Sequence, residues 1–329
     1  MAGSGLKVIY VMGAGHIGST VLDVAMSSHP RLESLGEVSK FHGFGWHLHE
    51  NRHCACGTTV HDCPFWTAVR HRWSELTGSD DAARYMTLQP RHERTAAGWR
   101  RLVRNRFSRT PDFLEYQRGT EAIYRAVQEI GGSEYLVDSS LTPKRAYAQA
   151  MNPNIDLYLI HLVRDGRGVM WSLMKPNKKI PGRPYVPAPP KRTTKYWISA
   201  NLQSAWVMRS VDEKKRLRIR YEDFALDPSR TLERIGTLIG EDMSGLVENG
   251  RLTTPSSTRH TVGGNRVRFI KDEDLQIRAD FSWLDNLADE HRRLFWRRAG
   301  WLARRFGYLR DQRQYGSSPS EDRALLGSR

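Results

Sequence analysis

Short apolar runs alternate along the chain with segments of helical periodicity. Leu6 to Met12 is a largely apolar run, typical of a buried parallel strand, and Ser19 to Ser28 is expected to form a helix that ends at a His-Pro pair. Glu134 to Asp138 and Ile155 to Val163 are two further β-rich runs, separated by a helix-like segment from Pro143 to Met151. This alternation predicts an α/β fold with a central parallel sheet flanked by helices.

The second half of the chain continues the pattern. Leu217 to Arg220 is expected to form a strand, after which Asp227-Pro228 supplies an N-cap and a first-turn proline and Gly240 ends the helix. Between them Leu232, Ile235, Leu238 and Ile239 form an apolar stripe. Apolar residues at helical spacing from Asp285 to Phe306, with arginines at many of the remaining positions, predict one C-terminal covering helix.

Two segments interrupt the alternation. Gly78 to Pro111 is arginine-rich with weak periodicity, and Lys175 to Lys195 is crowded with proline and lysine, so both are expected to be surface elements near a site. The polar tail from residue 311 to 329 is expected to be disordered, and residues 1–310 to form a single domain.

Charge narrows the class of ligand. The 329 residues include 51 lysines and arginines against 36 acidic residues, a net charge of +15, which favours an anionic ligand, a nucleic acid or an anionic membrane surface. No signal peptide and no apolar run of transmembrane length is apparent, so the sequence predicts a soluble cytoplasmic protein.

A glycine-rich loop follows the first predicted strand. Gly13 to Thr20 has the spacing of the Walker phosphate-binding loop, but Ser19 stands where that motif has lysine. The glycines and backbone N–H groups at a helix start suffice to bind an anion, whereas the lysine is what reaches the β- and γ-phosphates of a triphosphate. The loop is therefore expected to bind a phosphate that does not belong to a triphosphate.

A second anion-binding pair is predicted at the end of the 155–163 strand. Arg164 follows the strand, and Ser172 lies eight residues later, about two turns along the next helix. An arginine fork and a serine hydroxyl so placed can converge on one anion. Two anion sites on one sheet suggest a bis-phosphorylated ligand.

Together these motifs resemble the sulfotransferases that use 3′-phosphoadenosine-5′-phosphosulfate (PAPS) and that have a P-loop NTPase-like fold. The resemblance implies that Arg164 and Ser172 bind the 3′-phosphate and that Tyr221, in Tyr221-Glu222-Asp223-Phe224, contacts the adenine side. It implies that the 5′-phosphosulfate is held by the loop residues Gly15, His16, Ile17, Gly18, Ser19 and Thr20.

Two further segments extend the resemblance. Val137-Asp138-Ser139-Ser140, followed by Thr142-Pro143, is similar to a family segment, and so is His260 to Arg268. In many bacterial members the second segment closes over the nucleotide, which implies that Gly264, Asn265 and Arg268 contact the cofactor.

Two positions depart from the family pattern. His16 stands where members usually have arginine or lysine, the cation that stabilises the transferring group, and a histidine supplies this charge only when protonated. Neighbouring anions would favour the protonated ring. Leu141 stands where bacterial members often have lysine; Lys144, Arg167 or Arg266 are the candidates to replace that charge.

The resemblance implies in-line attack by an acceptor hydroxyl, or less favourably an amine, on sulfur, with adenosine 3′,5′-bisphosphate leaving. We expect no catalytic metal. Glu37 falls where several branches of the family have an acidic base and is the first candidate for it, with His42 second. The acceptor is expected to be a small molecule, a carbohydrate or a lipid-linked compound, and the candidates to line its pocket are Trp46, Phe65, Trp66 and the 175–195 segment. The identity of the acceptor and the oligomeric state of the protein stay open.

All three cysteines lie within ten residues: Cys54, Cys56 and Cys63, with His53 and His61 nearby. A zinc site is one interpretation, but Cys-x-Cys-x₆-Cys is not a standard zinc spacing. The expectation is a structural loop with reduced thiols or one disulfide, in a region that resembles the acceptor side of bacterial sulfotransferases.

Three other functions remain open from sequence. A P-loop kinase shares the fold, but Ser19 and the lack of an acidic partner for magnesium argue against it. A nucleic-acid-binding protein would fit the charge and the arginines between Trp99 and Tyr116, although no specific nucleic-acid motif is present. A pseudoenzyme that binds the nucleotide without transfer would fit His16 and Leu141.

Overall fold

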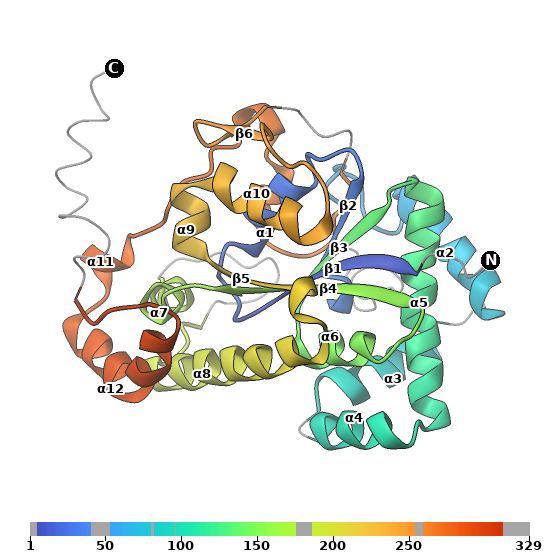
Figure 1. Ribbon diagram of the computed structural model, residues 1–329, viewed down its shortest axis with the longest axis horizontal. Coiled ribbons are helices and arrows are strands. Elements are labelled where there is room, and N and C mark those ends of the chain that lie inside the picture. The colour runs from blue at the N-terminus through green and yellow to red at the C-terminus, as the bar shows by residue number, and fades with distance from the viewer. Residues whose placement is uncertain are drawn as a thin grey trace.

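In the computed structural model, five parallel strands form the central sheet, in the order β2-β3-β1-β4-β5 (Figure 1). The structure describes residues 5–40, 53–79, 82–95, 97–175, 186–253 and 259–311. The strands are β1 (Leu6–Met12), β2 (Leu32–Gly36), β3 (Tyr135–Leu141), β4 (Ile155–Val163) and β5 (Arg216–Arg220). A small antiparallel pair, β6 (Val247–Glu248) and β7 (Arg251–Leu252), lies outside this sheet. The expected parallel α/β fold is confirmed.

Alternation along the strands places helices on both faces of the sheet. In β1, Val8 and Tyr10 belong to one apolar cluster and Ile9 and Val11 to the other, as the two-residue period of a strand requires. The helices on the Ile9 face include α1 (Ser19–Met26), α10 (Pro228–Ile239) and α12 (Asp289–Arg305). Those on the Val8 face include α2 (Pro64–Thr77), α3 (Ala83–Glu93), α5 (Pro111–Gly131) and α6 (Pro143–Ala150). Figure 1 shows α1 and α10 on one side of the strands and α6 on the other.

The predicted β1 and β4 strands have the bounds that the sequence indicates, and β5 begins one residue earlier. The capping prediction for α10 is also confirmed, since the Asp227 side chain accepts a hydrogen bond from the Arg230 N–H and Gly240 takes a left-handed conformation with φ of 78°. The remaining elements are α4 (Gly98–Phe107), α7 (Gly166–Met174), α8 (Pro190–Val207), α9 (Tyr221–Leu226) and α11 (Trp283–Asn286).

Three expectations about elements need correction. The 78–111 segment contains helices α3 and α4, whose buried Leu88 and Leu102 supply the apolar contacts that weak periodicity concealed. Within 175–195, residues from Pro190 onward begin α8 with proline in the first turn. The single covering helix is instead α11 and α12, separated at Leu287 and Ala288, because the extended Ala288 caps α12 and two acidic residues favour a helix start there. The tail from residue 312 to 329 lies outside the described residues.

Candidate functional site

The phosphate loop joins β1 to α1 and is fixed by close backbone approaches. A Cβ on Gly13 would lie 2.3 Å from the Leu162 carbonyl oxygen, and a Cβ on Gly18, whose φ is 83°, would lie 2.5 Å from the Tyr221 ring. Glycine is therefore required at both positions. The loop is held between the end of β4 and the start of α9, and Ile17 is fully buried within the apolar core.

His16 connects the loop to the second predicted anion site. Its carbonyl oxygen accepts a hydrogen bond of 3.0 Å from the Arg164 guanidinium, and its ring Nδ1 lies 3.2 Å from the Ser172 hydroxyl oxygen. His16 takes a left-handed conformation with φ of 64°, a region that few residues other than glycine adopt. Arg164 and Ser172 lie 148 and 156 residues after His16 in the sequence, and the fold brings them into one site with the phosphate loop.

Arg164 is 6% exposed and already binds an anionic side chain of this protein. Its second terminal nitrogen lies 3.2 Å from the Asp280 carboxylate and 2.7 Å from the Asp280 carbonyl oxygen. Lys175 pairs with the same carboxylate at 3.4 Å. Although burial opposes it, the hydrogen bonds from Ser282 and the charges of Arg164 and Lys175 lower the pKa of Asp280 to about 2. Asp280 therefore stays ionised at the site.

Tyr221 packs between the loop and Arg164. Its ring lies 4.4 Å from the Arg164 guanidinium carbon, a cation–π contact, and its hydroxyl accepts a hydrogen bond of 2.9 Å from the Asp280 N–H. The expected position of Tyr221 beside the anion-binding residues is consistent with this packing, whereas its contact with adenine stays a prediction.

Helix α8 supplies two contacts that sequence reasoning missed. The Gly15 N–H donates a hydrogen bond of 2.7 Å to the Tyr196 hydroxyl, and the Trp197 indole N–H donates to the Arg164 carbonyl oxygen at 3.0 Å. Asp280 was also missed. None of these residues lies in a recognisable motif, and only the tertiary fold brings them to the loop.

The segment from His260 to Arg268 lies against the start of α1. The Asn265 N–H donates to the Thr20 hydroxyl at 3.0 Å, and a Cβ on Gly264 would approach that same oxygen to 2.8 Å. Arg268 is buried and donates to the carbonyl oxygens of Gly264, Asn265 and His53. These contacts give Arg268 a role in shaping the segment; its contact with a cofactor stays a prediction.

Glu37 directly follows β2 and touches the same segment. Its N–H donates to the Val262 carbonyl oxygen at 2.8 Å, and its carboxylate pairs with Lys40. A Cβ on Gly263 would lie 2.9 Å from the Cβ of Glu37. The proposed base is therefore buried beside the residues that contact Thr20. His42, the second candidate, lies outside the described residues, as does Trp46.

Two of the candidate replacement cations are engaged elsewhere. The Lys144 ammonium donates to the Thr95 carbonyl oxygen at 2.8 Å, and Arg167 forms a buried ion pair with Asp165 at 2.7 Å. Arg266 is exposed two residues after Gly264. Leu141 has φ of 63° at the end of β3, where its carbonyl oxygen accepts a long hydrogen bond of 3.5 Å from the Gly13 N–H. Leu141 therefore contributes to the base of the loop through its backbone.

Of the aromatic residues proposed to line an acceptor pocket, Trp66 is the one whose burial argues against that role. Trp66 is 1% exposed and belongs to the apolar core, and the Phe65 ring stacks on the His260 ring with centroids 4.6 Å apart. His260 also lies close to the sulfurs of Cys54, Cys56 and Cys63. The two histidines near these cysteines in sequence, His53 and His61, do not belong to this group.

The sequence profile of the sulfotransferase family matches residues 9–245. This chain belongs to the sulfotransferase family. The match covers the loop, the Arg164–Ser172 pair and Tyr221, so the family expected from these motifs is confirmed and the protein is a transferase.

Among solved structures, this sulfotransferase is similar to the sulfotransferase domain from the Synechococcus PCC 7002 olefin synthase, with a TM-score of 0.49 and 18% identity over 94% of this chain and 98% of that one. It is also similar to the sulfotransferase domain from the curacin biosynthetic pathway, with a TM-score of 0.45 and 17% identity over 90% and 97% of the two chains. The sulfotransferase from Alicyclobacillus acidocaldarius gives a TM-score of 0.43 and 11% identity over 92% and 96%. These likenesses are too distant to carry an argument about the site. No curated protein sequence matches the chain.

Within the described part of this sulfotransferase, no helix combines the length and the apolar character needed to span a membrane.

Proposed function

We propose that this sulfotransferase transfers the sulfuryl group of PAPS to a hydroxyl, or less favourably an amine, of a small-molecule, carbohydrate or lipid-linked acceptor in the cytoplasm. The observation that carries the proposal is the position of His16, which contacts both Arg164 and Ser172 from within the phosphate loop. Two anion-binding groups that are joined in this way suit a nucleotide with two separated phosphates.

The residues present fit such a nucleotide. The loop presents backbone N–H groups at the start of α1, and Gly18 supplies a left-handed turn that a side chain would strain. Arg164 already pairs with one anionic group, the Asp280 carboxylate, at 3.2 Å. In the proposal Arg164 and Ser172 bind the 3′-phosphate, the loop from Gly15 to Thr20 binds the 5′-phosphosulfate, and Tyr221 faces the adenine.

PAPS, when bound, supplies a sulfuryl group activated by its link to phosphate. The acceptor oxygen forms a bond to sulfur, the bond from sulfur to the 5′-phosphate oxygen breaks, and its electron pair leaves with adenosine 3′,5′-bisphosphate. In the proposal Glu37, whose carboxylate pairs with Lys40, takes the acceptor proton. The loop N–H groups and a protonated His16 stabilise the charge that develops on the leaving phosphate.

The kinase alternative lacks an available acidic partner for magnesium on β3. Asp138 occupies that strand, but it is fully buried, pairs with Arg145 at 3.1 Å and accepts a hydrogen bond from Tyr124. A carboxylate held in this way is not free to orient a metal-bound water. Together with Ser19 in place of lysine, this disfavours transfer from a triphosphate.

The nucleic-acid alternative rests on the net charge and on the arginines between Trp99 and Tyr116. Two of these arginines bind carbonyl oxygens of this protein: Arg101 donates to that of Arg91, and Arg109 donates to that of Met151.

The proposal is tested by calorimetric titration with adenosine 3′,5′-bisphosphate, with adenosine 5′-monophosphate and ATP as controls. We expect selective binding of the bisphosphate, and a loss of about 10- to 100-fold in Arg164→Ala because one charged hydrogen-bonding partner is removed. Arg104→Ala, at an exposed position on α4, should bind as the wild type does. Equal affinity for the monophosphate would overturn the proposal. Binding without transfer to any acceptor in a broad screen would favour the pseudoenzyme.

A further inference from the structure

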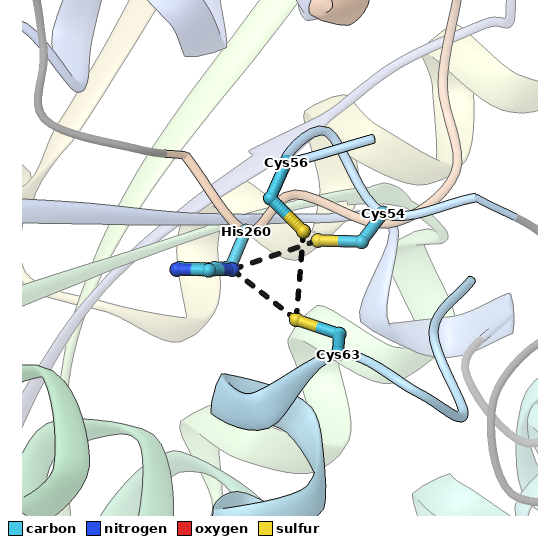
Figure 2. Close-up of side chains that lie close together, drawn as sticks. All are labelled: Cys54, Cys56, Cys63 and His260. Carbon is cyan, nitrogen blue, oxygen red and sulfur yellow. Dashed lines mark hydrogen bonds between the residues drawn. The ribbon is translucent and has the colours of Figure 1, made fainter. Parts of the chain in front are cut away.

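Three cysteines and one histidine converge outside the phosphate site. Figure 2 shows the side chains of Cys54, Cys56, Cys63 and His260 pointing toward one another. The Cys56 and Cys63 sulfurs are 3.7 Å apart, and His260 Nδ1 lies 3.7 Å from the Cys54 sulfur and 3.3 Å from the Cys63 sulfur. All four candidate ligand atoms lie within 4.8 Å of one another. We propose that these four residues, called the Cys₃His group below, form a structural zinc site.

The spacing is that of a tetrahedral zinc shell. Zinc–sulfur bonds of about 2.3 Å and zinc–nitrogen bonds of about 2.0 Å, at tetrahedral angles, separate two sulfurs by about 3.8 Å and a sulfur from a nitrogen by about 3.5 Å. Three of the six separations in the structure, at 3.7, 3.7 and 3.3 Å, lie close to these values, and all six are within 4.8 Å. Four protein ligands leave no open position for substrate, which is the pattern of a structural site.

The chemistry of the donors also selects zinc. Three thiols and an imidazole form a soft ligand set that suits Zn²⁺ and not Mg²⁺ or Ca²⁺. A neutral imidazole binds a metal through a ring nitrogen, and the Nδ1 atom of His260 is the one that faces the cysteine sulfurs. Cys54 and Cys63 are fully buried, as the ligands of a structural metal site usually are.

The backbone around the ligands is already organised. The Cys54 N–H donates to the Thr58 carbonyl oxygen at 2.8 Å and the Gly57 N–H donates to the Cys54 carbonyl oxygen at 3.0 Å, which forms a tight turn that carries the first two cysteines. Cys63 is the N-cap residue of α2. Each of these ligands is therefore set by a local structure that does not depend on the metal.

His260 comes from far along the chain and is oriented by its neighbours. Its ring stacks on Phe65 at an interplanar angle of 5°, and its carbonyl oxygen accepts a hydrogen bond of 2.7 Å from the Trp66 indole N–H. Such outer contacts orient a metal-binding imidazole. His260 lies 206 positions after Cys54 and 197 after Cys63, so the metal would connect the turn before α2 to the 260–268 segment.

A disulfide between Cys56 and Cys63 is the competing structure for these thiols. It would use two of the four donors and leave Cys54 and His260 joined only by their thiol–imidazole contact of 3.7 Å. All three cysteines are free thiols in this structure. The convergence of four donors therefore favours a metal over one covalent bond.

The test is the metal content of full-length protein purified without an affinity tag that binds metals. We expect one zinc per chain by mass spectrometry, and after replacement by Co²⁺ the visible bands and thiolate charge-transfer absorption of a tetrahedral site with sulfur ligands. Cys63→Ser should lose the metal, since serine can still cap α2 but is a poor zinc ligand. His61→Ala, which alters a nearby histidine outside the group, should keep it.

The cobalt spectrum of the wild type decides the matter even if Cys63→Ser does not fold. Protein that has been reduced and then offered Zn²⁺ or Co²⁺, yet binds neither stoichiometrically, would overturn the proposal. So would a Cys56–Cys63 disulfide in protein purified under reducing conditions, or metal that Cys63→Ser keeps and His61→Ala loses. Because the readout is the metal itself, failure here would leave the proposed sulfuryl transfer untouched.

Discussion

The ring Nδ1 of His16 lies 3.2 Å from the hydroxyl oxygen of Ser172, 156 residues later in the chain. The contact joins the phosphate loop to α7, the helix that follows Arg164. A positive charge on this ring would therefore be placed between the two groups that are proposed to bind the two ends of one nucleotide.

His16→Ala should lower the rate of sulfuryl transfer by about 10²- to 10³-fold, the usual effect of removing one group that stabilises developing charge. Histidine carries a proton only from acidic to near-neutral pH, whereas arginine stays charged. The wild-type rate should therefore fall as the pH rises above neutrality, and His16→Arg should remove that fall. Rates measured from pH 6 to 9 would contradict this role if His16→Ala kept the wild-type profile.

Asp280→Asn should increase the affinity for adenosine 3′,5′-bisphosphate about 3- to 10-fold. The substitution removes a negative charge that competes for Arg164 and Lys175, while asparagine can still accept the hydrogen bonds of Ser282. Calorimetry would measure the change, with Asp285→Asn, at an exposed position on α11, as the matched control. Weaker binding in Asp280→Asn would mean that the carboxylate positions Arg164 and does not compete with the ligand.

Glu37→Gln should reduce kcat about 10²- to 10⁴-fold and leave the affinity for the bisphosphate nearly unchanged, because an amide cannot take the acceptor proton. Lys40→Met is the companion variant, since it removes the ion pair and keeps the carboxylate. If both substitutions reduced kcat equally, the ion pair would be a structural requirement and Glu37 would not be the base.

Gly18→Ala should destabilise the protein by about 2 to 4 kcal/mol. This is the sum of the cost of a left-handed conformation at alanine and the cost of the steric clash between its Cβ and the Tyr221 ring. Gly240 has a similar φ of 78° with open space around it, so Gly240→Ala should cost only about 1 kcal/mol. Denaturant unfolding of both variants separates the two effects. Adding Tyr221→Ala to Gly18→Ala should recover part of the loss, and an additive double variant would argue against the collision.

Glu222 predicts a pH dependence of stability. Burial and the neighbouring Asp165 raise the pKa of this fully buried carboxyl from 4.5 to about 7. Between these pH values the folded state binds more protons than the unfolded state, so stability falls as the pH rises, by about 3 kcal/mol in total from this group.

Glu222→Gln should remove that contribution, because the amide can still accept from the Asp165 N–H and donate to the Tyr308 hydroxyl oxygen. The variant should gain stability relative to the wild type as the pH rises from 5 to 8. Thermal unfolding at several pH values measures it, with the exposed Glu248→Gln as control. A constant difference across this range would show that Glu222 does not titrate there.

The sequence predicted the parts of the fold that local pattern determines. Continuous apolar runs gave the bounds of β1 and β4, and Asp227, Pro228 and Gly240 gave those of α10, because caps and buried strands follow from short-range chemistry. The short β2 was missed, since Leu32–Gly36 carries few apolar residues. Its pairing with β3 and the contact of Gly36 with Val262 are tertiary.

The same division holds at the site. Arg164, Ser172 and the loop could be recognised because each lies in a motif at a fixed offset from a strand. Asp280 and Tyr196 could not, since Asp280 lies 116 residues from its partner Arg164 and Tyr196 lies 181 residues from its partner Gly15. His260 shows the same limit, because cysteine spacing directs attention to nearby histidines and gives no sign of one that is 197 residues distant.

The close approach of Gly13 to the Leu162 carbonyl sets the phosphate loop against the strand that leads into Arg164 through main-chain atoms alone. The sheet therefore sets how far the backbone of the loop lies from the backbone of Arg164. Substitutions on the surface around the site, whether selected in nature or in the laboratory, would leave this backbone distance unchanged. In the proposed function they would alter the choice of acceptor and preserve the length of nucleotide that the site accepts.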